Sequence, residues 1–174
     1  MNFKIGSKVF YPSHGAGWIK GEKEIEFNGE KKRYFEFELV TNLLSISSPV
    51  DNIDNLGIRP ILSTKDIKSK ISVLKKTPFV DPKMKDFNIM LNTFKELEES
   101  SSIDDSIKII QYCNHVKKTR EKEGRLIPIS IEKQLENAMK NIVGELAVSG
   151  GISLKTASKN FSEITGIEVE ISKD

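Results

Sequence analysis

The dipeptide Asn28-Gly29 constrains the fold of this chain more than any other feature, because it stands between two runs of alternating polar and apolar residues. Asn-Gly supplies the positive φ angles of a type I′ turn, which joins two antiparallel strands tightly. The alternation through residues 23–27 and 33–39 is typical of strands with one face in solvent. We therefore predict a β-hairpin from about residue 16 to residue 40.

Shorter strands are predicted on both sides of this hairpin. Residues 8–11, KVFY, are β-branched and aromatic, and Pro12 ends that strand because proline cannot donate to the next ladder hydrogen bond. Further strands are expected at residues 43–47, ending before Ser48 and Pro49, and at residues 57–60. Several short strands within about 60 residues favour a small Tudor-like or SH3-like β-barrel.

From residue 63 onward the apolar residues recur with the period of helices. Serine, aspartate and proline favour helix starts, and glycine favours helix ends. The expected starts are Ser63, the pair Asp81-Pro82, Ser102, Ser130 and Ser153, and the expected ends are Lys76, Ser100, Gly124, Gly150 and Thr165. The predicted fold class is therefore α+β, with a barrel domain at residues 1–60 and an all-helical bundle of about five helices at residues 61–174.

Composition excludes several classes of protein. The 27 basic and 25 acidic residues give a net charge of +2, so any basic surface has to be local. The single cysteine, Cys113, rules out an internal disulfide, and the two histidines leave no zinc-ligand spacing. No apolar run is long enough to span a bilayer. We expect a cytoplasmic monomer with no cofactor, no metal, no catalytic site and no small-molecule substrate.

Local clusters of cations suggest contact with DNA phosphates. One cluster falls at the end of the third predicted helix and extends into the fourth; its members are Lys117, Lys118, Arg120, Lys133 and Lys140. The alternative is a solvent-exposed face whose cations interact favourably with the macrodipole at the C-terminal end of the helix. A second candidate is Lys83, Lys85 and Phe87, where an aromatic ring beside cations could stack on a base or enter a groove. Here the alternative is a core position for Phe87.

The predicted hairpin also permits a docking role. An exposed sheet edge presents unpaired N–H and C=O groups to which a partner can add a strand. Aromatic residues alternate with charges along the second arm of the hairpin, which fits either core filling or docking.

Three segments of the chain carry a resemblance to a known family, and they read FKIGSKVFYPSHGAGWI, KGEKEIEFNGEKKRYFEFEL and LSISSPVDNIDNLGIRPI. They resemble the N-terminal module of the bacterial CarD/CdnL transcription regulators, which is itself similar to the RNA polymerase-interacting domain of transcription-repair coupling factor. The helical part shows the resemblance best in the segment IVGELA, residues 142–147. The resemblance covers about residues 1–150.

The resemblance implies a Tudor-like domain that binds the β subunit of RNA polymerase, and a helical domain that meets promoter double-stranded DNA beside the upstream edge of the bubble. The outcome would be control of open-complex stability. Phe87 or Asp86 stands where the family carries a wedging tryptophan. The residues expected at polymerase are Ile25, Phe27, Arg33, Tyr34, Phe35, Ile46 and Ser47.

Two other functions stay open at this point. One is an architectural DNA-binding protein that works without polymerase. The other is an enzyme, for which His14 is the only candidate general base, although a histidine in a proline-glycine turn is more often structural.

Overall fold

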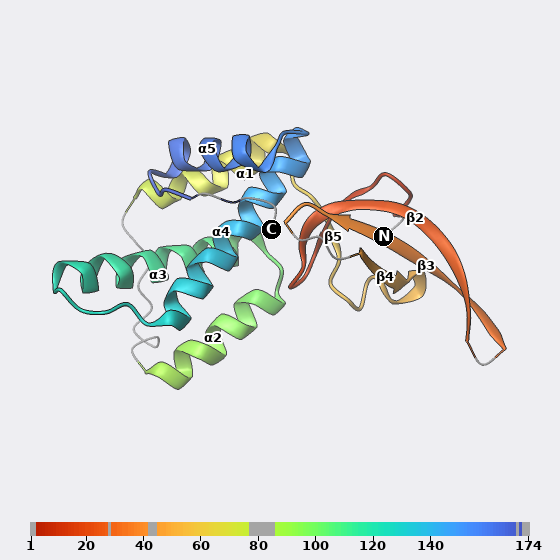
Figure 1. Cartoon of the computed structure of the whole chain (residues 1–174), viewed down its shortest axis with the longest axis horizontal. Helices are drawn as coiled ribbons and strands as arrows, with labels where there is room; N and C mark the ends of the chain where they lie inside the picture. Colours follow the sequence, from red (N-terminus) through yellow and green to blue (C-terminus); the bar gives the residue numbers. More distant parts are fainter. Residues whose placement is uncertain (1–2, 28, 42–44, 77–85, 170, 172–174) are drawn as a thin grey trace.

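The N-terminal part of the chain forms an antiparallel sheet of five strands, and five α-helices follow it (Figure 1). This computed structural model describes residues 3–27, 29–41, 45–76, 86–169 and 171, and of Phe27 and Phe87 only the backbone. The predicted α+β class is confirmed. Among the described helices, none combines the length and the apolar character that crossing a bilayer requires.

The sheet is a meander whose last strand returns beside the first. Its order is β4-β3-β2-β1-β5, and all neighbours are antiparallel. The strands are β1 (Lys8–Tyr11), β2 (Gly15–Phe27), β3 (Glu30–Leu39), β4 (Ser45–Pro49) and β5 (Arg59–Pro60).

The predicted hairpin is confirmed. Phe27 stands opposite Glu30, so two residues connect β2 to β3, and Gly29 takes the positive φ of 79°. A register shift between Ile19 and Gly21 interrupts the ladder, and beyond it the two long strands extend away from the rest of the molecule as a curved arm (Figure 1). A bulge at such a place increases the local bend of a strand.

The predicted end of the fourth strand before Ser48 and Pro49 is wrong. β4 continues through both residues, and Pro49 stands opposite Tyr34 of β3. Among the described strands, β4 pairs only with β3, so it forms one edge of the sheet. Proline is tolerated on an edge strand, where its missing N–H removes no ladder hydrogen bond. The first part of the predicted strand, residues 43–44, lies outside the described residues.

Serine caps begin three of the five helices as predicted. The hydroxyl oxygens of Ser63, Ser102 and Ser153 accept hydrogen bonds from backbone N–H groups two or three residues further on. Such a bond satisfies a helix donor that otherwise has no partner. The helices are α1 (Thr64–Ile71), continued by the short 3-10 helix η2 (Ser72–Lys75), α2 (Phe87–Glu99), α3 (Ile103–Lys122), α4 (Ile129–Gly150) and α5 (Leu154–Thr165).

Of the two remaining predicted helix starts, one is wrong and the other lies outside the described residues. Ser130 does not cap the fourth helix: α4 begins at Ile129, and its cap position is Pro128, which has no side-chain acceptor. The predicted start at Asp81-Pro82 lies outside the described residues. Helix α2 as described begins at Phe87, and the Asp86 carboxylate caps it by accepting from the backbone N–H groups of Asn88 and Ile89.

Two apolar cores lie on opposite faces of the same sheet. Side chains of a strand alternate between its faces. In β1, Val9 and Tyr11 enter a small core inside the curved sheet, whereas Phe10 enters the larger core with the helices. After the exposed Lys8, the residues VFY are therefore apolar without interruption because both faces of the strand are buried there. Helix α4 is the helix that packs on β1 and β2, and Gly144 brings it close to Ala16 and Val40.

Candidate functional site

The arm formed by β2 and β3 has one face that is free of the small core. In the register of the arm, Lys23 stands opposite Tyr34 and Ile25 opposite Lys32. Glu36, two residues after Tyr34, stands opposite Ser47 of β4. Because facing residues share a side of the sheet, Ile25, Tyr34 and Ser47 lie on one face. We call these three residues the outer face.

Other members of the predicted polymerase set lie on the opposite face. Phe35 is only 5% exposed and belongs to the small core, and Ile46 packs against the same core from β4. Arg33 is exposed there, and its guanidinium donates to the Glu22 carboxylate at 3.1 Å. The structure therefore divides the predicted residues between two faces, and only Ile25, Tyr34 and Ser47 stay together as accessible side chains. The side chain of Phe27 lies outside the described residues.

The edge strand β4 lies beside the outer face. β3 pairs with the backbone N–H and C=O groups on one side of β4, so the groups on the other side of the strand point outward. Ser48 fixes the strand from inside, because its hydroxyl and that of Tyr11 are hydrogen-bonded at 2.9 Å. The arm extends away from the helices (Figure 1).

A buried ion pair joins the sheet to the helices. Arg59 of β5 donates to both carboxylate oxygens of Glu145 of α4, at 3.0 and 2.5 Å. It also donates to the Ser101 carbonyl oxygen at 2.7 Å and stacks over the ring of Phe10 at 4.5 Å. The Glu145 side chain is 2% exposed. Burial raises the pKa of this carboxyl group, and the Arg59 guanidinium opposes that rise. A single guanidinium thus connects β5, β1, α4 and the α2–α3 connection.

A second group of polar contacts lies near the C-terminal end of α4. The Ser149 hydroxyl donates to the Leu62 carbonyl oxygen at 2.8 Å and accepts from the Thr64 hydroxyl at 3.0 Å. The Lys8 ammonium group donates to the Ser149 carbonyl oxygen at 3.0 Å. Together with the ion pair, these bonds fix the orientation of α4 on the sheet.

The predicted DNA-contacting cations are distributed over two helices. Lys117, Lys118 and Arg120 lie in the last turns of α3, while Lys133 is exposed near the start of α4. Arg120 also has a local role, since it donates to the Leu126 carbonyl oxygen of the α3–α4 connection at 3.0 Å.

The fifth cation, Lys140, stands apart from the others. It lies further along α4 and lines a cavity at the sheet, whereas Lys118 lines a different hollow together with Leu74 and Gly166. The structure therefore keeps Lys117, Lys118 and Arg120 together and separates Lys140 from them. Lys83 and Lys85 of the second candidate lie outside the described residues, and so does the side chain of Phe87.

His14 lies in the turn after β1 with its ring edge against the ring of Tyr11, the centroids being 4.9 Å apart. In the described part of the chain, no three His, Cys, Asp or Glu side chains are grouped as a metal would require. Cys113 is buried in the helical core, and burial raises the pKa of its thiol to about 12.

Comparison with known proteins finds a family match in the part of the chain that forms the sheet. Residues 3–62, which contain all five strands, match the family model of the CarD-like/TRCF RID domain. The resemblance predicted from the sequence is confirmed for this part, and the CarD-like family is one of transcription regulators that interact with RNA polymerase.

A curated relative extends the similarity beyond the CarD-like domain. The chain is 25% identical over 155 residues to the "Putative transcription factor YdeB" of Bacillus subtilis (strain 168). The aligned part covers 88% of this chain and 95% of the relative. The similarity therefore includes helices as well as the sheet.

Sequence reasoning missed the ion pair between Arg59 and Glu145. The two residues are 86 positions apart, and no local pattern links them. One signal was present: Glu145 is the only charged residue between Ile142 and Val148, within a run that otherwise reads as buried. A lone carboxylate on the buried face of a helix needs a partner from elsewhere in the chain.

Proposed function

We propose that this chain is a non-enzymatic transcription regulator that binds the β subunit of RNA polymerase through its sheet and contacts promoter DNA through its helices. The observation that carries the proposal is the match of residues 3–62, the whole sheet, to the CarD-like/TRCF RID domain. The similarity to a relative named as a transcription factor supports the same function for the longer chain.

The outer face and the β4 edge are the proposed contact with polymerase. Edge strands bind partners by adding a strand, with backbone hydrogen bonds for affinity and side chains for specificity. Tyr34 is half-buried on β3, next to the β4 edge, and Ile25 is 37% exposed on β2. This surface therefore has an aromatic and an aliphatic side chain. Aromatic residues often contribute a large share of binding energy at interfaces. Phe35 and Ile46 would support this surface from the core behind it.

The cations at the end of α3 are the proposed contact with DNA. Lys117, Lys118 and Arg120 would neutralise phosphates close to the bubble edge. Binding to polymerase through the sheet turns DNA contact into an intramolecular step, so weak contacts suffice at a promoter. A protein that binds open promoter more tightly than closed promoter stabilises the open complex by that difference in affinity.

The direct test measures binding of the full-length chain to isolated polymerase β subunit at low salt. We expect saturable one-to-one binding. If the β subunit shows no binding at low salt, the polymerase contact is wrong. An architectural protein would instead bind duplex DNA tightly without polymerase, which a mobility-shift assay with the purified chain detects.

A second test concerns DNA. The double variant Lys117→Glu/Lys118→Glu should lower the affinity for duplex DNA and reduce the slope of log K against log salt by about 2, because each phosphate contact contributes about 0.9. The matched control is Lys155→Glu, an exposed lysine on α5, which should leave the slope unchanged. An unchanged slope in the double variant would remove these cations from the proposed DNA contact.

A further inference from the structure

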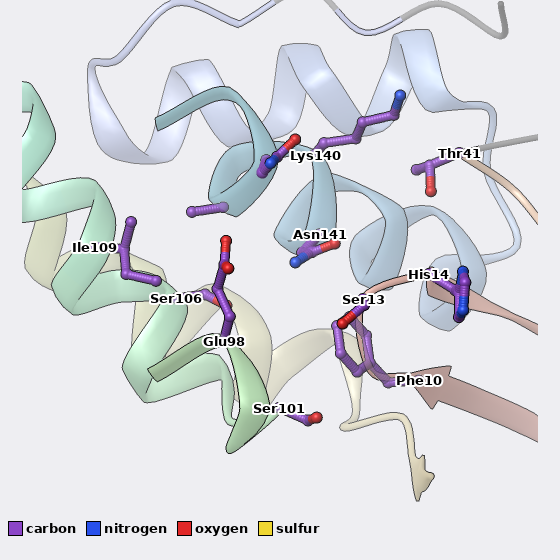
Figure 2. Close-up of a pocket in the computed structure, with 12 residues that line it drawn as sticks. Phe10, Ser13, His14, Thr41, Glu98, Ser101, Ser106, Ile109, Lys140 and Asn141 are labelled. Carbon is purple, nitrogen blue, oxygen red and sulfur yellow. The ribbon is translucent and has the colours of Figure 1, made fainter. Parts of the chain in front are cut away.

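A cavity of about 240 Å³ lies where the sheet meets the helices (Figure 2). Four separate parts of the chain form its wall. They are the turn after β1, Thr41 just after β3, the end of α2 with the connection to α3, and the facing sides of α3 and α4. Most of its side chains are polar, and they include Ser13, Glu98, Ser101 and Asn141. Polar cavities of this kind hold water or a polar ligand, whereas empty cavities are apolar.

Glu98 supplies a carboxylate to this cavity. In Figure 2 its side chain points from the end of α2 into the space between the helices. Within the described residues this carboxylate makes no hydrogen bond or ion pair, and burial raises its pKa. In Figure 2 the Lys140 side chain points away from Glu98. A half-buried carboxylate without a partner favours a ligand that carries positive charge and hydrogen-bond donors.

Two strained serines line the same cavity. Among the described residues, Ser13 (φ 61°) and Ser101 (φ 56°) are the only non-glycine residues with positive φ. Elsewhere the chain meets this requirement with glycine, as at Gly57 and Gly124. Residues held in sparsely populated conformations cluster at functional sites. Glycine would adopt this backbone conformation more easily than serine, so a serine at this position suggests a role for its hydroxyl group in binding. In Figure 2 the Ser13 hydroxyl points toward the cavity.

We propose that this cavity binds a small organic ammonium ion, with the Glu98 carboxylate on the ammonium group and the Ser13 hydroxyl and Asn141 amide on the remaining polar atoms. The cavity volume is below the range of drug-sized sites, which begins at about 300 Å³, so the ligand has only a few heavy atoms. This site is separate from the proposed polymerase and DNA contacts and does not depend on either.

The bound ion would also strengthen the junction between sheet and helices. Ser13 belongs to the turn after β1, while Glu98 and Asn141 belong to α2 and α4. A ligand that contacts all three binds the folded junction and not the unfolded chain, so it raises the melting temperature by mass action.

The experiment titrates the full-length chain with ethanolammonium chloride and follows amide chemical shifts by NMR. Ethylene glycol, sodium acetate and sodium chloride, at matched ionic strength, are the comparison probes. We expect saturable shifts around residues 13, 98 and 141 with ethanolammonium alone. Glu98→Gln should weaken binding about tenfold or more, because the lost contact is a charge-assisted hydrogen bond. The matched control is Glu96→Gln. Glu96 is an exposed glutamate of the same helix that does not line the cavity, so this variant should bind like the wild type.

Ser13→Gly separates a ligand role from a structural one. Glycine relieves the positive φ, so the variant should melt at a higher temperature than the wild type in the absence of ligand, yet bind ethanolammonium several-fold more weakly. The proposal is overturned if no probe produces saturable shifts, if ethylene glycol or sodium ion produces the same shifts, or if Glu98→Gln binds as tightly as the wild type. None of these results depends on polymerase or DNA, so the proposed function is tested independently.

Discussion

The two faces of the sheet differ in what stabilises them. The inner face closes over a small core made only of its own strands and their connections, including Val9, Ile19 and Phe37. The opposite face meets the helices through a mixed junction, in which apolar contacts around Gly144 lie beside the buried pair of Arg59 and Glu145. The difference suggests that the sheet depends on close backbone packing, whereas its orientation relative to the helices depends on one specific polar contact.

The largest expected effect concerns packing within the sheet. In Gly17→Ala the new Cβ atom would lie 2.0 Å from the Glu38 carbonyl oxygen, a backbone atom that cannot move without separating β2 from β3. We expect a loss of about 3 kcal/mol or more in the free energy of unfolding, measured by urea denaturation.

The matched control for this substitution is Gly144→Ala on α4. There the nearest contact is 3.1 Å, to the movable Thr41 side chain, and alanine favours the helix. We expect its net effect to stay within about 1 kcal/mol. Equal destabilisation by both substitutions would contradict the view that backbone packing dominates in the sheet.

The next effect concerns the junction. Arg59→Ala leaves the Glu145 carboxylate buried without a partner and should lower the free energy of unfolding by about 2–3 kcal/mol. This loss lies near the lower end for broken buried pairs because the Arg59 side chain is 21% exposed. The double variant Arg59→Met/Glu145→Leu removes both charges and should recover much of that loss.

Lys70→Ala provides the control for the junction. Lys70 pairs with Asp104 at the surface, at 2.7 Å, and such exposed pairs contribute at most about 1 kcal/mol. If Arg59→Ala cost no more than Lys70→Ala in the same urea experiment, the buried pair would not hold the junction.

The smallest expected effect uses Cys113 as a local probe. Because burial raises the pKa of its thiol to about 12, the thiolate fraction at pH 8 is very small, and the native protein should react with Ellman's reagent only slowly. Arg59→Ala should accelerate the reaction several-fold at pH 8 if the junction limits opening of the helical core. Complete reaction of the native wild-type protein within the time that the unfolded chain requires would contradict the burial of this thiol.

Local chemistry predicted much of this fold. Asn28-Gly29 predicted the hairpin, and Ser63, Ser102 and Ser153 predicted three helix starts, because turns and caps depend on a few neighbouring residues. The predicted cap at Ser130 was wrong, because α4 begins at Ile129 and Pro128 occupies its cap position. A capping serine and a serine in the first turn look alike without the backbone angles.

Long-range features could not be predicted in the same way. Pro49 is compatible with a strand only because β4 is an edge, and that depends on the order of all five strands. The alternation of polar and apolar residues along 33–39 does not show which residues fill the core. Phe35 and Tyr34 are therefore both predicted to contact polymerase, although they lie on opposite faces of the sheet. Residues that are distant in sequence, such as Arg59 and Glu145, become neighbours only through the packing of α4 on the sheet.

The most direct test of the account compares the two faces of the arm in binding to isolated polymerase β subunit. Ile25→Ala/Tyr34→Ala changes the outer face and should raise the dissociation constant about tenfold or more, since buried aromatic contacts at interfaces contribute over about 1 kcal/mol each. Glu24→Ala changes an exposed residue on the opposite face of the same arm and should shift it less than about twofold. Equal affinity of the outer-face variant and the wild type, at full folding by circular dichroism, would contradict docking through this face.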